Sequence, residues 1–307
     1  MKNTTLPLVI NFHACAVCNF SCQGCYSKWH NHQNEVWNDP SNVRQIIENI
    51  AKFHRDHFGE SGTPWRLSIV GGEPSLFKDK IQFVAKTARA YGAEVSVISN
   101  GSHLENIFPF ARLFSQVGVS LDSFSHETNL KIGRHCHGKT LSYEEIASKL
   151  VTLRAINPKI RIKVNTVVNQ NNYNELLVDK VAALGATKYK ILRQIPFDCC
   201  KGVTDEQFFS FLRNNYREDL FASDGAPSQH IFVEDNAAML GSYLMIAPDG
   251  RLFQNGQAEY RYSHPLMSTP FEVAMKEVGF AEGKFFNRYT SVATDATIAK
   301  MKLASAA

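Results

Sequence analysis

The sequence predicts an α/β protein built on a parallel sheet, and three observations carry this prediction. Short apolar runs alternate with segments of helical periodicity about six times, the connections between them are mostly short, and no Gly-, Pro- or Ser-rich linker divides the chain. Repeated strand–helix units of this kind form parallel βαβ crossovers. With 307 residues, 44% of them hydrophobic, the chain can bury a substantial core as two domains or as one large α/β domain.

The individual elements follow from apolar spacing. Residues 41–58 carry apolar side chains at helical spacing behind Ser41, a candidate N-cap. Residues 142–156 are expected to form another helix, because Ser142 and Glu145 make a capping-box pattern at its start. Strands are expected at 6–14, 65–70, 93–99, 118–124, 160–168 and 188–195.

The pattern changes near residue 225. Residues 242–255 are expected to form a hairpin that turns at residues 248–250, and a helix is predicted to follow at 271–280. We therefore divide the chain into a main part, 1–225, and a C-terminal extension, 226–307, which belongs to the same structural unit and closes the site.

The net charge and the lack of targeting or membrane-spanning segments argue against several classes of protein. The net charge is only +4 and the two signs are interspersed, so binding to nucleic acid is not expected. No signal peptide and no membrane-spanning run is recognisable, which predicts a cytoplasmic protein that does not bind membranes. In a reducing compartment, clustered cysteines bind metal or react more often than they form disulfides.

Four of the seven cysteines lie within residues 15–25, in the pattern C-x2-C-x3-C-x2-C. Structural zinc sites separate two such pairs by about a dozen residues or more, so the spacing argues against zinc. The alternative is C-x3-C-x2-C, formed by Cys18, Cys22 and Cys25, with Cys15 as a bystander. Three thiolates on a cubane leave one iron open to a further ligand.

A second motif, VGGEP, ends the second predicted strand. Gly71 and Gly72 allow the backbone to approach a ligand closely, and Glu73 supplies an acceptor for an ammonium group. The sequence Gly-Gly-Glu-Pro is also typical of an ordinary turn. The order of the two motifs, each at the carboxyl end of a strand, favours the functional interpretation.

The two motifs together resemble those of the radical S-adenosylmethionine (SAM) superfamily. This resemblance implies a partial (β/α)6 TIM-like barrel, open at one side, with a [4Fe–4S] cluster on Cys18, Cys22 and Cys25 and SAM at the carboxyl ends of the strands. Many members carry an aromatic residue just before the third cysteine. Here Gly24 stands at that position, with Tyr26 following, so the loop around the adenine is expected to differ.

Within the superfamily, the blocks SVISNGSHLEN, VSLDSFSHETNLKIGRHCHGK and IRIKVNTVVNQNN are similar to the viperin family over residues 8–280. The resemblance implies a nucleotide dehydratase that converts CTP, UTP or GTP to its 3′-deoxy-3′,4′-didehydro analogue, a chain-terminating antiviral nucleotide. A 5′-deoxyadenosyl radical formed from SAM removes the C4′ hydrogen, and the 3′ hydroxyl leaves as water. An electron donor such as flavodoxin or ferredoxin and a monomeric state are implied as well.

The strand patterns support a polyanionic substrate independently of the resemblance. Period-two alternation places Lys163 and Asn165 on one strand face, Lys188 and Lys190 together on another, and Arg66 inward from a third. No acidic residue on these faces pairs with the four cations, although single lysines at strand ends often reach solvent. Unpaired buried charges are costly, so a triphosphate is expected between them.

The viperin resemblance assigns further roles residue by residue. SAM contacts are implied for Gly71, Gly72, Glu73, Asn100, Ser120 and Arg134. Substrate contacts are implied for Asn11, Arg66, Lys163, Asn165, Lys188, Lys190 and Tyr243, with Tyr243 placed near the ribose as the catalytic residue. The chain departs from the animal enzymes by exchanging Arg and Lys at positions 66 and 188 and by having Val70 in place of Ser.

Two other classes remain open. One is a different radical SAM enzyme, an activase or a peptide modifier, although these generally have a second cluster or a peptide-docking domain and no cysteine follows Cys200. The other is a non-catalytic iron–sulfur or zinc protein. The preferred nucleobase is not determined by the sequence.

Overall fold

The computed structural model describes residues 7–27, 34–59, 61–196, 201–221, 230–255, 260–290 and 292–306. Within these residues ten strands form one sheet in the order β10-β9-β8-β1-β2-β3-β4-β5-β6-β7. The strands are β1 Leu8–Cys15, β2 Trp65–Gly71, β3 Glu94–Ser99, β4 Gln116–Ser120, β5 Arg161–Val168, β6 Lys188–Arg193, β7 Ile231–Glu234, β8 Leu244–Ile246, β9 Arg251–Gln254 and β10 Arg261–Pro265.

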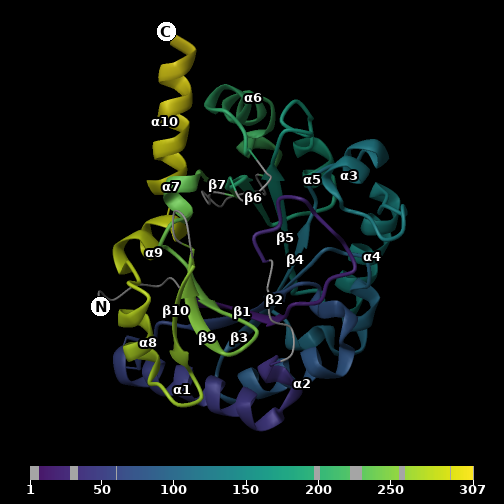
Figure 1. Ribbon diagram of the computed structural model, residues 1–307. Coiled ribbons are helices and arrows are strands. Elements are labelled where there is room, and N and C mark those ends of the chain that lie inside the picture. The colour runs from purple at the N-terminus through teal and green to yellow at the C-terminus, as the bar shows by residue number, and fades with distance from the viewer. Residues whose placement is uncertain are drawn as a thin grey trace.

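The sheet curves into a ring with the helices outside it, and the ring is open (Figure 1). Strands β1 to β7 are all parallel, and β8 adds a parallel strand on the other side of β1. The α-helices are α1 Pro40–Phe58, α2 Lys78–Ala90, α3 His126–Ile132, α4 Tyr143–Ile156, α5 Val178–Ala183, α6 Asp205–Asn215, α7 Asn236–Met239, α8 Phe271–Glu277, α9 Glu282–Tyr289 and α10 Val292–Ala306; short 3-10 turns are η1 Val36–Asn38, η2 Pro74–Leu76, η3 Leu104–Leu113 and η4 Glu218–Leu220.

This architecture confirms the predicted partial barrel. Strands β1 to β6 alternate with helical segments as predicted, β7 adds a seventh parallel strand, and no pairing among the described residues closes β7 onto β10. Apolar side chains such as Ile162 and Val164 of β5 are fully buried beneath the outer helices, while Lys163 and Asn165 line a cavity inside the ring. The alternation in the sequence thus sets which side chains face the interior.

The C-terminal extension enlarges the sheet at both ends. Strand β7 pairs with β6, and the hairpin of β8 and β9 pairs with β1, turning through Pro248, Asp249 and Gly250 as expected. Helix α8 follows in the segment predicted to be helical. None of the helices in the described part of the chain combines the length and apolar character needed to cross a bilayer. The division at residue 225 stays a prediction.

Two local predictions were wrong. Helix α1 begins at Pro40, and its N-cap is Asp39, whose carboxylate accepts from the Ser41 amide, because proline fits the first helical position. Strand β4 covers Gln116–Ser120 rather than 118–124. Beyond its end, the Asp122 side chain rather than the backbone accepts from the Val167 amide of β5. Residue 6 of the first predicted strand lies outside the described residues.

Candidate active site

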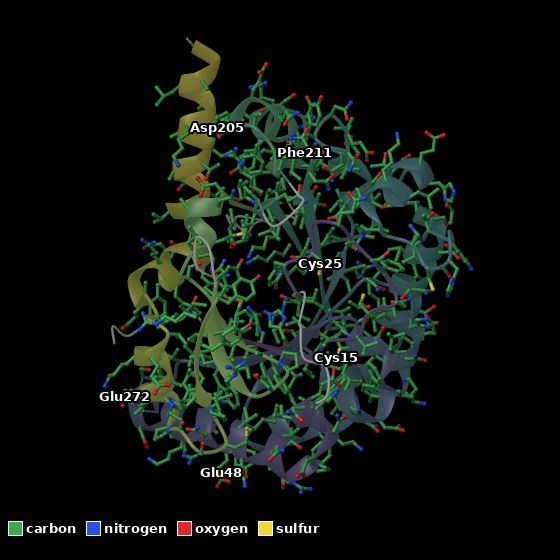
Figure 2. The ribbon with its side chains drawn as sticks, viewed as in Figure 1. Cys15, Cys25, Glu48, Asp205, Phe211 and Glu272 are labelled. Carbon is green, nitrogen blue, oxygen red and sulfur yellow. The ribbon has the colours of Figure 1, made fainter. Side chains whose placement is uncertain are left out.

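A cavity of about 510 Å³ occupies the interior of the ring. It extends from the carboxyl ends of the strands, where the cysteine loop lies, to their amino ends. Of the sequence-predicted site residues, all except Glu73 line it: Asn11, Cys18, Cys22, Cys25, Arg66, Gly71, Gly72, Asn100, Ser120, Arg134, Lys163, Asn165, Lys188, Lys190 and Tyr243. In Figure 2, Cys25 lies toward the interior of the ring, away from the outer helices.

The cysteine loop is held in place by main-chain contacts. The Ser21 amide donates to the Gly133 carbonyl at 3.2 Å, and the Gln23 amide donates to the Ile132 carbonyl at 3.0 Å, so the loop packs on the end of α3. Gly133 has φ 86°, and a Cβ there would overlap the Ser21 carbonyl. Glycine is therefore required where the loop meets the helix.

The three cysteines fit a cluster better than a single metal ion. Cys18 is exposed and Cys22 and Cys25 are half-buried on the cavity wall, whereas Cys15 is fully buried in the core. A zinc ion needs ligands within about 2.3 Å of one point, and no three His, Cys, Asp or Glu side chains of the described residues are grouped for that. A cubane distributes three thiolates over three irons, so it suits this donor set.

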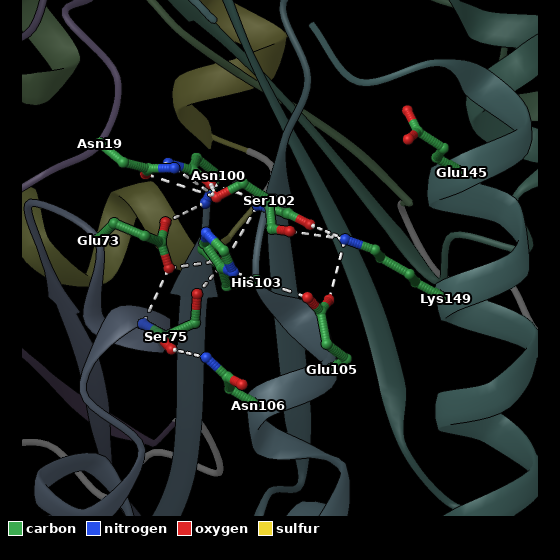
Figure 3. Close-up of polar contacts among 12 residues, drawn as sticks. Asn19, Glu73, Ser75, Asn100, Ser102, His103, Glu105, Asn106, Glu145 and Lys149 are labelled. Carbon is green, nitrogen blue, oxygen red and sulfur yellow. Dashed lines mark hydrogen bonds and ion pairs between the residues drawn. The ribbon is translucent and has the colours of Figure 1, made fainter. Parts of the chain in front are cut away.

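Hydrogen bonds to sulfur surround Cys18. The Phe20 amide lies 3.4 Å and Asn100 Nδ2 lies 3.7 Å from Cys18 Sγ. Asn100 is fixed by Asn19 Oδ1 at 2.9 Å and by Ser102, whose amide and hydroxyl both donate to Asn100 Oδ1 (Figure 3). Such donors stabilise a thiolate and influence the reduction potential of a cluster bound there.

Glu73 is placed differently from the other predicted SAM residues. Its side chain is fully buried, and it accepts from the Ser75 amide and the Ser99 hydroxyl at 2.9 Å each and from the Asn100 amide at 2.5 Å (Figure 3). Burial raises the pKa of Glu73, while these donors oppose the rise. In this structure Glu73 shapes the Asn100 loop, and its contact with the SAM ammonium group stays a prediction.

The two glycines before Glu73 have a reason that the sequence did not reveal. A Cβ at Gly71, which has φ 152°, would stand 2.5 Å from the Cys15 carbonyl oxygen, and one at Gly72 would overlap the Val17 carbonyl. The Gly72 amide donates to the Cys15 carbonyl at 2.7 Å. The close backbone approach in this structure is to residues 15–17, which tie the cysteine loop to β2, and the contact of the two glycines with SAM stays a prediction.

Asp122 and the Ser120 carbonyl orient the side chain of Arg134. Its Nη1 lies 3.2 Å from Asp122 Oδ2, and its Nη2 donates to the Ser120 carbonyl. Both members of the ion pair are nearly buried, which holds the guanidinium at the cavity wall beside Cys22. Asp122 was not predicted as a site residue, because nothing in its strand pattern distinguishes it from a surface carboxylate.

The predicted cations gather at the amino ends of the strands, but two of them have acidic partners. Arg66 Nη2 lies 2.6 Å from Glu94 Oε2, and Lys190 Nζ lies 2.6 Å from Glu234 Oε1. The expectation of four cations without acidic partners is therefore wrong. The partners come from neighbouring strands, β3 and β7, whose pairing with β2 and β6 the sequence pattern did not specify.

Lys163 and Lys188 make no ion pair with any described residue. The Nζ of Lys188 lies 3.5 Å from the Phe232 ring centroid, and the two lysines are direct neighbours in the register of β5 and β6. Burial, reinforced by the charge of Lys190, lowers the pKa of Lys188 to about 7 and that of Lys163 well below its ordinary value. Burial also lowers the pKa of Lys190 to about 8.

A fifth cation, Arg288 of α9, was missed by the sequence reasoning. It is only 4% exposed and lines the cavity, and its Nε and Nη2 have no hydrogen-bond partner among the described residues. Its Cζ lies 3.5 Å from the Tyr243 ring centroid, and its Nη1 lies 3.7 Å from Glu234 Oε1. No motif surrounds Arg288 in the sequence, so only the fold shows that it belongs to the site.

Tyr243 is at the centre of these charges. Lys190 Nζ donates to the Tyr243 hydroxyl at 2.7 Å, and the hydroxyl donates to Glu234. Burial and the charge of Glu234 raise the pKa of Tyr243 well above its ordinary value, so the phenol stays protonated. Asn165 of β5, which is paired with Lys190 of β6, is 7% exposed and its Oδ1 has no partner among the described residues. Both residues line the cavity.

The arrangement agrees with comparisons to known proteins. The sequence-family model of the radical SAM superfamily matches residues 14–179 of this chain. An S-adenosylmethionine-dependent nucleotide dehydratase of Fibrobacter sp. (strain UWH6) is 48% identical over 94% of this chain and 90% of its own length, and one of Psychrobacter lutiphocae is 36% identical over 94% and 96%. The structure of anSMEcpe with bound AdoMet and Kp18Cys peptide shares the fold, with a TM-score of 0.65 at 14% identity over 91% of this chain and 84% of that one.

The cysteine spacing, the open barrel and these relatives agree on one assignment. Enzymes of this superfamily use a [4Fe–4S] cluster together with SAM, and the donor set described above fits such a cluster. The chain therefore belongs to the radical SAM superfamily and, within it, to the S-adenosylmethionine-dependent nucleotide dehydratases of the viperin family.

Proposed function

We propose that this enzyme converts a ribonucleoside triphosphate, CTP, UTP or GTP, to its 3′-deoxy-3′,4′-didehydro analogue. The observation that supports the proposal best is a single cavity with cluster-type thiols at the carboxyl ends of the strands and five cations at the amino ends. Arg66 and Gly71 are five positions apart on β2, about 17 Å at the rise of a strand. That separation suits a nucleotide whose phosphates and ribose lie between the two ends.

The residues of the basic end would bind and orient the substrate. Lys163, Lys188 and Arg288, which have few or no partners of their own, are the natural ligands of the phosphates. Anchoring the phosphates there fixes the ribose at the level of Asn165 and Tyr243, whose polar atoms face the cavity. Positioning of this kind is the main contribution that a protein makes to a cofactor-dependent reaction.

The bound cluster and SAM supply the chemistry that removes a hydrogen atom from the substrate. The protein's contribution is an enclosed cavity that limits side reactions and a set of neutral donors around the ribose. We assign Tyr243 as the catalytic residue because its hydroxyl stays protonated and is fixed by Lys190 and Glu234. Asn11 is assigned to a polar contact with the nucleotide.

A peptide-modifying activity is the alternative, since the structures that share the fold include enzymes with bound peptides. Their identity to this chain is 14% and 12%, which supports a common fold alone. A peptide backbone carries no charge that would balance Lys163 and Lys188. The basic end of the cavity therefore favours a nucleotide over a peptide.

We infer three further properties. An electron donor of the flavodoxin or ferredoxin type would reduce the cluster, because the chemistry requires one electron from outside the protein. Cluster thiolates require a reducing compartment, which fits the cytoplasm. The enzyme would act as a monomer, because all the predicted site residues belong to one chain and those that line the cavity do so within it.

The substrate class can be tested directly. Anaerobic, cluster-reconstituted protein with SAM and a reductant is expected to form 5′-deoxyadenosine and a dehydrated nucleotide with at least one of CTP, UTP and GTP. Affinity should decrease from triphosphate to diphosphate to monophosphate, since each lost phosphate leaves buried cations without a partner. Product mass and calorimetric titration measure the two effects. Equal binding of monophosphates, or turnover with a peptide alone, would contradict the proposal.

Binding should depend on pH through the lysines. A triphosphate favours their ammonium forms and so raises the low pKa values of Lys188, about 7, and Lys190, about 8. The complex then holds more protons than the free protein, so affinity falls as the pH rises from about 7 to about 9, by up to about tenfold per unit for each proton taken up. Calorimetry in buffers of different ionisation enthalpy measures the proton uptake. Proton release on binding would refute this assignment.

A further inference from the structure

Gly24, between two of the cluster cysteines, is a glycine for reasons of space. Its backbone is not in the left-handed region, so conformation alone does not require glycine. A Cβ built at Gly24 would overlap Gln194 Nε2 and stand 3.0 Å from Gln194 Cδ. The carboxamide of Gln194 therefore occupies the place where a side chain at position 24 would stand.

Gln194 is an unpartnered polar group built into the cavity wall. It follows β6, and its amide donates to the Val168 carbonyl at 3.0 Å, so its backbone is fixed to β5. The residue is 7% exposed and lines the cavity, yet its carboxamide makes no hydrogen bond to the described residues. The nearby Gln170 differs, because its Nε2 is bonded to the Gly202 carbonyl and to Gln207.

The Gln194 residue is more than nine-tenths buried, yet its carboxamide has no partner among the described residues and opens into the cavity, so the group is available to hydrogen-bond a ligand there. The group touches the cysteine loop between two cluster ligands, which places it where SAM binds rather than among the phosphate-binding lysines. SAM carries an adenine ring, on which an amino donor lies beside a ring-nitrogen acceptor. A carboxamide offers the complementary acceptor and donor side by side.

We propose that Gln194 recognises the adenine of SAM through its carboxamide, and that Gly24 is small so that the carboxamide can reach this position. The pair replaces an aromatic side chain in the loop with a hydrogen-bonding group from the residue that follows β6. This inference depends on SAM binding at the cysteines and is independent of which nucleotide is the substrate.

The test is equilibrium binding of SAM to anaerobic, cluster-loaded protein. Gln194→Ala is expected to weaken SAM binding by about 5- to 100-fold, the usual effect of losing one bidentate contact to a base. Gln194→Glu should also bind more weakly, because a carboxylate has no donor for the ring nitrogen. Iron content and the affinity for whichever of CTP, UTP and GTP the parent binds are expected to stay at parental values. Gln207→Ala, which removes a carboxamide outside the cavity, is the matched control.

Two outcomes would overturn the proposal. Parental SAM affinity in Gln194→Ala would show that the carboxamide makes no contact with SAM. A variant with normal SAM affinity and weakened binding of the nucleoside triphosphate that the parent binds would show that Gln194 recognises the substrate base instead. A failed nucleotide assay with normal SAM binding would affect only the proposed substrate, so the two hypotheses fail separately.

Coupling between the two residues provides an independent measurement. Gly24→Ala should displace the carboxamide and lower SAM affinity in the parent, but it should have little effect in Gln194→Ala, where no carboxamide remains. A double-mutant cycle with additive effects would contradict the proposal. A SAM analogue dimethylated at N6 cannot donate to Oε1. The parent should therefore discriminate against it more strongly than Gln194→Ala does.

Discussion

Alanine at Cys18, Cys22 or Cys25 is expected to abolish iron loading and SAM cleavage, whereas Cys15→Ala should retain both. The three residues line the cavity, while Cys15 is fully buried in the core and outside the lining. Removing one of three thiolates leaves an iron of the cubane without its protein ligand, so the cluster is lost rather than weakened. Iron and sulfide analysis after anaerobic reconstitution, with the electronic absorption spectrum, measures the effect.

Cys15→Ala is the matched control, because it removes a thiol from the same segment. It deletes one buried sulfur, which costs only a modest amount of stability. Thermal unfolding of the unloaded protein separates that cost from a loss of cluster. Cluster loss in Cys15→Ala with normal unfolding, or a normal iron content in Cys22→Ala, would show that the ligand assignment is wrong.

Replacing Lys163 with methionine should weaken triphosphate binding by about 30- to 1000-fold, which corresponds to about 2–4 kcal/mol for a buried charge-assisted contact. Lys163 is the most informative of the cations to remove, because it makes no ion pair with any described residue and so leaves no buried carboxylate behind. Its pKa is lowered by burial and by Lys190 and Lys188, which shows that the free cavity disfavours its charge. Anaerobic titration calorimetry with CTP, UTP and GTP measures the loss.

Two comparisons make this experiment specific. Lys159→Met changes an exposed lysine just before β5 and should leave nucleotide affinity unchanged. Lys190→Met should additionally reduce stability, because Glu234 would remain buried without its partner at 2.6 Å. SAM affinity should be the same in all three variants. If Lys163→Met binds triphosphates as the parent does, the basic end of the cavity does not bind phosphate.

The sequence was sufficient to predict the barrel and fifteen of the residues that line the cavity, for a physical reason. A strand exposes alternate residues to opposite faces, so Lys163 and Asn165 had to share one face once β5 was recognised. The same rule placed Lys188 with Lys190. The cysteine motif and the glycine motif each follow a strand directly, so their position at the carboxyl ends of a parallel sheet was predictable as well.

What the sequence could not show depends on contacts between distant segments. Arg288 and Glu234 reach the cavity from the C-terminal extension, and their distance in sequence from β5 and β6 conceals the contact. Gly71 and Gly72 were predicted as ligand-binding glycines, and the sequence did not show that residues 15–17 also pass too close to them for a side chain. Local patterns indicate which face a side chain occupies, whereas its partner across the cavity depends on tertiary packing.

An open barrel has a strand at each end of its sheet whose backbone groups could pair with another chain. At the β7 end, the Val233 amide donates to Thr294 Oγ1 of α10 at 3.1 Å, so the last helix supplies a partner to the border strand. Helix α10 runs beside β7 and then projects from the ring (Figure 1). The C-terminal helix thus covers part of the β7 edge and disfavours edge-to-edge aggregation with another chain. A closed barrel has no such edge strand to cover.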